Sequence, residues 1–216
     1  MILAIETSST LCSVSFWENG KTFAEYESDA PMQHATLIGQ FVEKGLKELK
    51  NPPRLVAVAI GPGSFTGLRI GLSYAQGFCF GREIPIVGVS NHQVLASQKI
   101  SKTKETFTII DARRNEVYLA KHKNDEIFEI ESHQIIAIEN LVEHIPTSAQ
   151  LIGQQGIAIP ENIVSELNEK GIDLKLDVKY SAAKVAQIGK IKSEKIGNDN
   201  IETIEPMYIR PFAGVQ

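Results

Sequence analysis

The first hundred residues show hydrophobic patterns that predict strands before helices. Residues Ile2 to Thr7 are mostly apolar, and residues 12–16 alternate with a period of two, so both segments predict strands. The pair Asn19-Gly20 predicts a tight hairpin turn, after which residues 22–27 return as a third strand. The chain therefore begins with an antiparallel meander.

Helical spacing follows this meander. Apolar residues recur at helical intervals over residues 33–49, and the prolines at 52 and 53 end that helix. The apolar run 55–60 predicts a central strand that is covered on both faces. A second helix is expected from Ser64 or Thr66, then a strand over 84–89 and a helix from about residue 91. This order is typical of an α/β half-domain.

The second half of the chain repeats this order in a weaker form. A polar stretch at residues 101–105 marks the expected boundary, so we predict an N-terminal lobe over 1–103 and a C-terminal lobe over 104–216, whose last segment could return to the first. The expected strands are 107–111, 117–122, 127–132, 149–152 and 172–176, and the expected helices are 160–170 and 181–196. Both halves thus begin with antiparallel strands.

Composition excludes several classes of protein. The 216 residues include 22 Lys and Arg against 26 Asp and Glu, a net charge of −4 that disfavours a protein gripping nucleic acid alone. No segment has the run of about 20 apolar residues that a membrane span needs. The start of the chain lacks the basic region of a signal peptide. Cys12 and Cys79 are expected to be buried cytosolic thiols, and the five histidines lack metal-ligand spacing.

Three segments carry candidate chemistry, each with a plainer alternative. The glycine-rich turn Gly61 to Gly71 could present backbone N–H groups to an anion. It does not match the dinucleotide-binding motif, because Thr66 stands where that motif has its third glycine. Tight packing of the strand against the helix is therefore the favoured interpretation. Glu6-Thr7-Ser8 could hold phosphate through Mg²⁺, or form a polar turn. Asp111 and Arg113 could be a functional pair or a surface ion pair.

The helix after the glycine turn is apolar nearly all round. Gly67, Gly71 and Ala75 fall four residues apart, a row that would let another helix approach closely. We therefore expect this helix and the first helix to face a partner subunit, although the other lobe could cover them instead. The expected contact residues are Leu37, Phe41, Leu46, Gly67, Leu68, Gly71, Leu72 and Ala75.

Several segments together resemble the TsaB (YeaZ) family. They are residues 2–9, the run Gly61 to Gly71, Gly88-Val89-Ser90, the segment Asp111 to Tyr118, and the tail Pro206 to Arg210. The resemblance implies the two-lobed α/β fold of actin, Hsp70 and sugar kinases (the ASKHA fold), each lobe a mixed sheet with helices and the second lobe reduced.

The resemblance also implies a function. The family is a non-catalytic scaffold that works with the catalytic paralogue TsaD and the ATPase TsaE. Together they transfer threonylcarbamoyl from threonylcarbamoyl-AMP to the adenosine beside the anticodon of tRNAs reading codons that begin with A. The resemblance implies a cytoplasmic protein that does not bind membranes. It implies pairing with TsaD through N-lobe helices and a homodimer when TsaD is absent. Contact with tRNA is expected mainly through the complex. No cofactor is required, while weak ATP or ADP binding, alone or at a subunit interface, stays open. Vestigial phosphate contacts would be Glu6, Thr7, Ser8, Gly61, Gly63, Ser64 and Asp111.

Departures from the catalytic paralogue support the scaffold interpretation. Thr10 and Leu11 stand where the paralogue has an acidic pair, and Asn91 and Leu95 stand where it has two metal-binding histidines. One alternative is a standalone ATP-dependent enzyme of the sugar-kinase fold. A glycoprotease-like hydrolase is the other, although the chain has no His-Glu-x-x-His.

Overall fold

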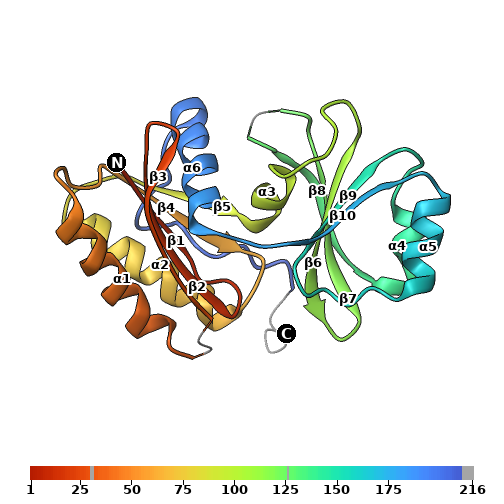
Figure 1. Ribbon diagram of the computed structural model, residues 1–216, viewed down its shortest axis with the longest axis horizontal. Coiled ribbons are helices and arrows are strands. Elements are labelled where there is room, and N and C mark those ends of the chain that lie inside the picture. Colours follow the sequence, from red (N-terminus) through yellow and green to blue (C-terminus); the bar gives the residue numbers. More distant parts are fainter. Residues whose placement is uncertain (30–31, 126, 211–216) are drawn as a thin grey trace. The chain divides into compact units, whose positions relative to one another are not determined.

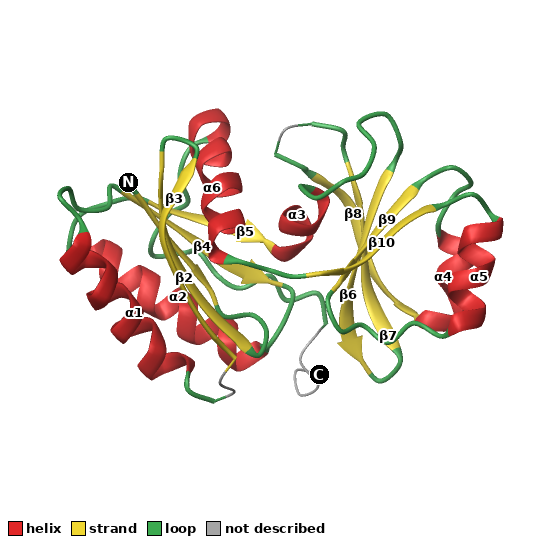
Figure 2. Ribbon diagram, viewed as in Figure 1, coloured by secondary structure: helices red, strands yellow, loops and turns green. Residues whose placement is uncertain are grey.

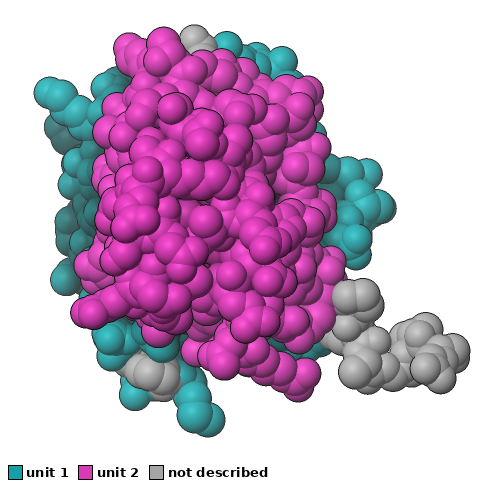
Figure 3. All heavy atoms as spheres, turned by 90° about the vertical axis from the view of Figure 1, so that its right-hand side faces the viewer, with its two compact units in different colours: residues 1–91, 181–207 teal, residues 92–180, 208–216 magenta. Residues whose placement is uncertain are grey.

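The computed structural model describes residues 1–29, 32–125 and 127–210, which form two compact units (Figure 3). Unit 1 comprises Met1–Asn91 and Ser181–Met207, and unit 2 comprises His92–Tyr180 and Tyr208–Gln216. The division therefore falls after Asn91 and not after residue 103, since His92 already bonds to Thr108 in unit 2. The segment that returns to unit 1 starts at Ser181, and residues 211–216 lie outside the described part.

Unit 1 is built on a five-stranded mixed sheet with the order β3-β2-β1-β4-β5 (Figure 1). Its strands are β1 (Ile2–Glu6), β2 (Leu11–Glu18), β3 (Lys21–Asp29), β4 (Leu55–Gly61) and β5 (Ile86–Ser90), and its helices are α1 (His34–Glu48), α2 (Phe65–Phe80) and α6 (Ala182–Ile196). Asn19 and Gly20 both have positive φ, as the expected hairpin turn requires. The meander and the alternation after it are confirmed.

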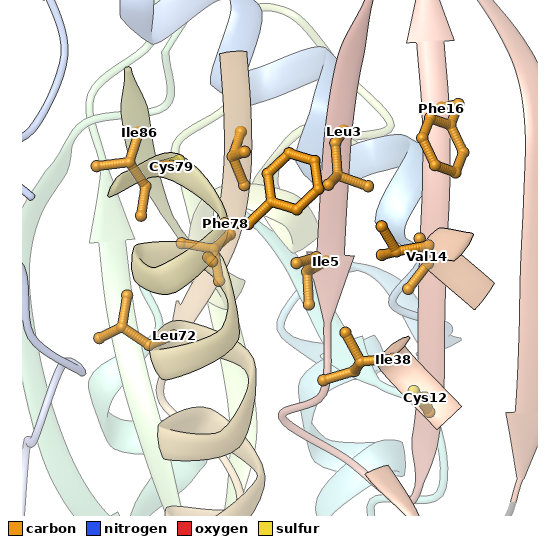
Figure 4. Packing of buried hydrophobic residues seen from close by; sticks show 14 residues of the cluster. Leu3, Ile5, Cys12, Val14, Phe16, Ile38, Leu72, Phe78, Cys79 and Ile86 are labelled. Atoms are coloured by element: carbon orange, nitrogen blue, oxygen red, sulfur yellow. The ribbon is translucent and has the colours of Figure 1, made fainter. Parts of the chain in front are cut away.

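Helices α1 and α2 cover one face of this sheet (Figure 2). Alternate residues of β1, Leu3 and Ile5, point to that face and are fully buried. They pack against Phe78 and Leu72 of α2 and against Ile38 of α1 (Figure 4). The core of unit 1 therefore lies between the first strands and these two helices.

Helix α6 covers the opposite face, far from β1 in sequence. A Cβ on Gly189 would come within 2.6 Å of the Ala57 Cβ, so glycine allows the helix to approach β4 closely. Lys192 Nζ donates to the Gly88 carbonyl at 2.5 Å, and Asp199 Oδ2 accepts the Gly88 N–H at 2.8 Å. These two side chains satisfy the outward-facing N–H and carbonyl of Gly88 in β5, the edge strand.

Unit 2 contains the second five-stranded sheet, ordered β10-β9-β6-β7-β8. Its strands are β6 (Thr106–Arg113), β7 (Glu116–His122), β8 (Ile130–Ala137), β9 (Gln150–Gln154) and β10 (Asp173–Val178). Its helices are the short 3₁₀ helix η1 (Ile138–Asn140), α4 (Leu141–His144), α5 (Glu161–Glu169) and α3 (Asn91–Ala96), whose first residue still belongs to unit 1. Helices α4 and α5 pack on one face, with Leu141 and Leu167 buried against Ile109. Counted from its own first strand, unit 2 has the same strand order as unit 1.

Two details of unit 2 differ from the expected elements. β8 spans Ile130–Ala137 and not residues 127–132, and the short helices η1 and α4 that follow it are not predicted. The helices of unit 2 are shorter than those of unit 1: α5 has 9 residues, whereas α1 has 15 and α2 has 16. Across the described ranges, no helix is both long and apolar enough to span a membrane.

Candidate functional site

A buried polar cluster lies at the end of β1. Glu6 is fully buried, and its Oε1 accepts both the Ser8 backbone N–H and the Ser8 hydroxyl, each at 2.5 Å. Asn91 Nδ2 donates to Ser8 Oγ at 2.5 Å and to the Pro62 carbonyl at 2.9 Å. Burial raises the pKa of Glu6 from 4.5 to about 7, and the two bonds from Ser8 oppose that rise. The cluster joins β1 to the glycine-rich turn and to the start of α3.

Two hydrogen-bond acceptor atoms of this cluster have no donor in the described part of the chain. Among the described residues, neither Glu6 Oε2 nor Asn91 Oδ1 has a hydrogen-bond partner, and both atoms are buried. A buried carboxylate without full hydrogen bonding is costly, which is consistent with the raised pKa of Glu6. Glu6 is therefore suited to holding a proton near neutral pH.

The glycine-rich turn packs closely onto this cluster. A Cβ on Gly63 would come within 2.5 Å of the Ser8 carbonyl oxygen, and one on Gly67 within 1.9 Å of the Thr7 oxygen. The Ser64 N–H donates to the Ser8 carbonyl at 2.6 Å, and the Gly67 N–H to Ser64 Oγ at 3.2 Å. The glycines are thus needed for close packing, and these two N–H groups already have partners within the chain.

The seven expected phosphate contacts fall into two groups. Glu6, Thr7, Ser8, Gly61, Gly63 and Ser64 come together in unit 1, whereas Asp111 belongs to unit 2. Gly61 has a φ of +99° and its carbonyl accepts from Ser90 Oγ at 2.9 Å. Asp111 Oδ1 accepts the Arg113 N–H at 2.7 Å, and Oδ2 forms an ion pair with the Arg113 guanidinium at 3.1 Å. The side chain of Asp111 therefore holds its own hairpin.

The tip of the β6–β7 hairpin has an unusual backbone. Arg113, Arg114 and Asn115 are consecutive and have φ values of +64°, +57° and +58°. The left-handed conformation costs an L-residue about 1–2 kcal/mol, with asparagine among the more tolerant. Two arginines therefore occupy positions that glycine would fill with less strain.

The inner face of α2 corrects part of the expected partner surface. Leu68, Leu72 and Ala75 are buried, and a Cβ on Gly71 would come within 2.3 Å of Thr7 Oγ1. The row of small residues that includes Gly67 therefore fits α2 to its own sheet and is not a surface for another helix. The three expected residues on α1 (Leu37, Phe41 and Leu46) are partly buried against the same core.

The outer face of α2 carries a second row of small residues, which the sequence reasoning missed. Ser73, Gly77 and Gly81 fall four apart, and a Cβ on Gly77 would meet nothing within 4 Å. A shallow hollow here is lined by Ser73, Tyr74, Gly77, Phe78 and Arg82. The aromatic side chains of Phe65 and Phe80, at the two ends of the helix, are 41% and 78% exposed. We call Phe65, Ser73, Tyr74, Gly77 and Phe80 the α2 outer face.

A buried histidine chain in unit 2 was also missed. His92 Nδ1 lies 2.7 Å from Thr108 Oγ1, which lies 2.9 Å from His122 Nε2, and His122 Nδ1 lies 2.9 Å from the Phe128 carbonyl. Because a carbonyl only accepts, the neutral His122 carries its proton on Nδ1. The Thr108 hydroxyl then donates to His122 and accepts from His92. Burial lowers the pKa of His122 from 6.5 to about 4 and that of His92 well below 6.5.

The two cysteines lie in the core of unit 1. Cys12 and Cys79 are free and buried, and burial raises the pKa of each thiol to about 12. Both are therefore protonated and unreactive near neutral pH. Over residues 1–29, 32–125 and 127–210, no group of three or more His, Cys, Asp or Glu side chains is placed to hold a metal ion.

The strand order shared by both units defines the class of the protein. Each sheet has its first strand in the centre, with the next two strands of an antiparallel meander on one side and two strands parallel to the first on the other. This is the two-lobed ASKHA architecture of actin, Hsp70 and sugar kinases. Two solved structures support it: YeaZ from Pseudomonas aeruginosa aligns with a TM-score of 0.74 at 22% identity, covering 96% of this chain and 98% of that chain. A second P. aeruginosa structure, titled as an uncharacterized protein similar to the peptidase YEAZ, aligns with a TM-score of 0.77 at 22% identity, covering 97% and 99%.

Sequence comparisons identify the family. The family model described as TsaD, tRNA N6-adenosine threonylcarbamoyltransferase, matches residues 28–209. A tRNA threonylcarbamoyladenosine biosynthesis protein TsaB from Haemophilus influenzae is 29% identical over 97% of this chain and 93% of its own length. The Escherichia coli protein of that name is 38% identical over 58% of this chain, a match that spans only 56% of its own length. The chain belongs to the TsaB (YeaZ) family, whose members are tRNA threonylcarbamoyladenosine biosynthesis proteins.

Proposed function

We propose that this chain is a non-catalytic partner subunit for the transfer of threonylcarbamoyl to tRNA, working in the cytoplasm with TsaD and TsaE. TsaD performs the transfer from threonylcarbamoyl-AMP to the adenosine beside the anticodon, and this chain supports TsaD by direct pairing. It needs no metal or nucleotide of its own. Without TsaD it pairs with a second copy of itself.

The observation that carries this proposal is the match to TsaB over nearly the whole chain. The surroundings of Asn91 and Leu95 add to it, since these residues stand where the catalytic paralogue has metal-binding histidines. Both are fully buried, and Asn91 Nδ2 donates to Ser8 Oγ and to the Pro62 carbonyl. The packing of these side chains supports a structural role for positions that are catalytic in the paralogue.

The α2 outer face is the surface best suited to pairing. Exposed aromatic side chains are enriched at protein interfaces, and small residues one helical turn apart let a second helix approach closely. Phe80 supplies the first feature, and Ser73 with Gly77 supplies the second. Leu37 and Phe41, on the neighbouring helix α1, are partly buried. The Phe41 ring stacks on Tyr26 of β3, with ring centroids 5.9 Å apart, so these two residues lie toward the β3 edge of the sheet and not on the α2 outer face.

The proposal is tested by reconstitution. Purified TsaD and TsaE, with tRNA, threonine, bicarbonate, ATP and the enzyme that makes threonylcarbamoyl-AMP, are assayed for modified tRNA with and without this chain. We expect modification only when the chain is present, and no activity from the chain alone. Modification at an equal rate without it would refute the proposal.

The pairing surface is tested with Gly77→Arg. An arginine at this open, exposed helical position leaves the fold intact, because glycine is a weaker helix former by about 0.5–1 kcal/mol. We expect the variant to lose co-elution with TsaD on size exclusion and to sediment as a monomer alone. The matched control is Asn168→Arg, at an exposed position of α5 in unit 2. Full pairing of Gly77→Arg would show that α2 is not the contact.

A further inference from the structure

The hairpin tip formed by Arg113, Arg114 and Asn115 is held in its strained backbone by contacts from three sides. Asp111 Oδ1 accepts the Arg113 N–H at 2.7 Å, and the Asp111 N–H donates to Gln154 Oε1 at 3.1 Å. The Ile138 N–H donates to the Asn115 carbonyl at 2.9 Å. Strained backbone that its surroundings enforce in this way is concentrated at functional sites.

The same contacts arrange the arginines in two layers. At the base of the hairpin, the Arg210 guanidinium donates to the Ala112 carbonyl and to Glu116 Oε2. At the tip, the Arg113 side chain is 85% exposed, although it touches Asp111. Arg114 is exposed, and in the part of the chain that the structure describes it forms no ion pair. The carboxylates Asp111 and Glu116 thus steady the base and leave Arg114 free to bind an outside anion.

The chemistry of the tip favours phosphate over a protein surface. A guanidinium presents a planar set of donors that matches phosphate oxygens, and arginine is preferred for phosphate and nucleic-acid recognition. Arginine also occurs at protein hot spots, but there it lies with aromatic anchors in well-packed, desolvated pockets. The apolar residues next to this tip, Ala112 and Val117, are buried in the sheet, so the tip offers only polar groups.

We propose that Arg113 and Arg114 bind the phosphodiester backbone of the tRNA, so that unit 2 of this subunit is a direct RNA contact. This inference rests on the proposed function, which brings a tRNA to the complex. Because the chain as a whole has a net charge of −4, its attraction for RNA must come from local basic groups such as these arginines. The tip therefore positions the RNA and does not read its sequence.

The test uses the complex reconstituted with TsaD and labelled tRNA. The double variant Arg113→Gln, Arg114→Gln should bind tRNA roughly tenfold more weakly, and the slope of log K against log salt should be less steep by about two. The matched control is the double variant Lys50→Gln, Arg54→Gln, which also removes two positive charges, from exposed side chains of unit 1, and should change neither value. Unchanged affinity and salt slope in the double variant would overturn the inference.

A second variant separates binding from folding. Arg114→Gly relieves the left-handed strain, so we expect an equal or higher Tm together with weaker tRNA binding. A lower Tm with normal tRNA binding would assign the arginine a structural role and overturn the inference. So would a loss of TsaD co-elution with normal tRNA affinity of the residual complex, because that result marks a protein contact. If the wild-type chain fails to support modification but its complex binds tRNA through these arginines, the proposed function fails and the RNA contact stands.

Discussion

Replacing Glu6 with glutamine should prevent the loss of stability that unit 1 of the wild type undergoes as the pH rises. Burial raises the Glu6 pKa from 4.5 to about 7, so the folded state holds a proton that the unfolded chain has already released. A raised carboxyl pKa contributes stability that is fully present below 4.5 and is lost as the pH rises through 7. At about 1.36 kcal/mol per pH unit, the rise corresponds to about 3 kcal/mol at pH 8. Glu6→Gln keeps the shape and never ionises, so it avoids this loss.

The assay is urea denaturation at pH 5, 6, 7 and 8, followed by the fluorescence of Trp17. This residue is the chain's only tryptophan, and it lies in β2 of unit 1, the strand that pairs with β1. We expect Glu6→Gln to exceed the wild type by about 3 kcal/mol at pH 8 and by less than about 1 kcal/mol at pH 5.

The matched control is Glu43→Gln, on the surface of α1 in the same unit. Glu43 forms an exposed ion pair with Lys47, and solvent screens such a pair, so it contributes little to stability. The control should therefore follow the wild type closely at pH 6, 7 and 8. Parallel pH profiles for wild type and Glu6→Gln would refute the reasoning, because they would mean that Glu6 is ionised at little cost in the folded protein.

The remaining predictions concern three other positions and the binding of ATP. Acid should destabilise unit 2, because the His122 pKa is lowered to about 4 in the folded state. The stability that the neutral imidazole contributes is present above pH 6.5 and is lost as the pH falls toward 4. Hydrogen exchange of the β6 and β7 amides at pH 7 and 5 measures this loss of stability. Thr108→Val, which breaks the histidine chain, should speed exchange of the same amides at pH 7. Gly71→Glu should unfold unit 1 as judged by Trp17 fluorescence, because its Cβ would strike Thr7; a folded variant would show that the inner face of α2 can yield. Calorimetry of the isolated chain with ATP and Mg²⁺ should show no tight binding, whereas tight binding with turnover would favour a standalone enzyme.

Local patterns were sufficient for most elements of unit 1. Period-two alternation, the Asn19-Gly20 turn and the helical stripe of α1 are short-range signals, and each corresponds to an observed element. In unit 2, residues 131–134 of β8 are exposed and polar, so the hydrophobic pattern of the strand is weak and its predicted bounds are wrong. The turn α4 has only four residues, too few to show a period.

The candidate site depended on contacts that a local pattern does not reveal. The hydrogen bond between Ser8 and Asn91 joins residues 83 positions apart. The sequence alone indicates only that Asn91 stands where the catalytic paralogue has a metal-binding histidine. The row Gly67, Gly71 and Ala75 does indicate that another element packs closely against α2. The spacing does not say whether that element is a helix or the end of a strand, because both require small residues at the contact. Here the approaching group is Thr7 of the chain's own first strand. The outer row of Ser73 and Gly77 has the same spacing, and only the packing of α2 distinguishes the two.

The discontinuity of unit 1 has a consequence for how the protein is made on the ribosome. β1 and β4 emerge early, but α6, which covers one face of both strands, lies at residues 182–196 and emerges nearly last. Most of unit 2 is one continuous stretch, His92–Tyr180, that is translated in between. The nascent chain therefore carries an uncovered sheet face through the synthesis of residues 92–180, and all strands of the second sheet are translated before α6 covers the first.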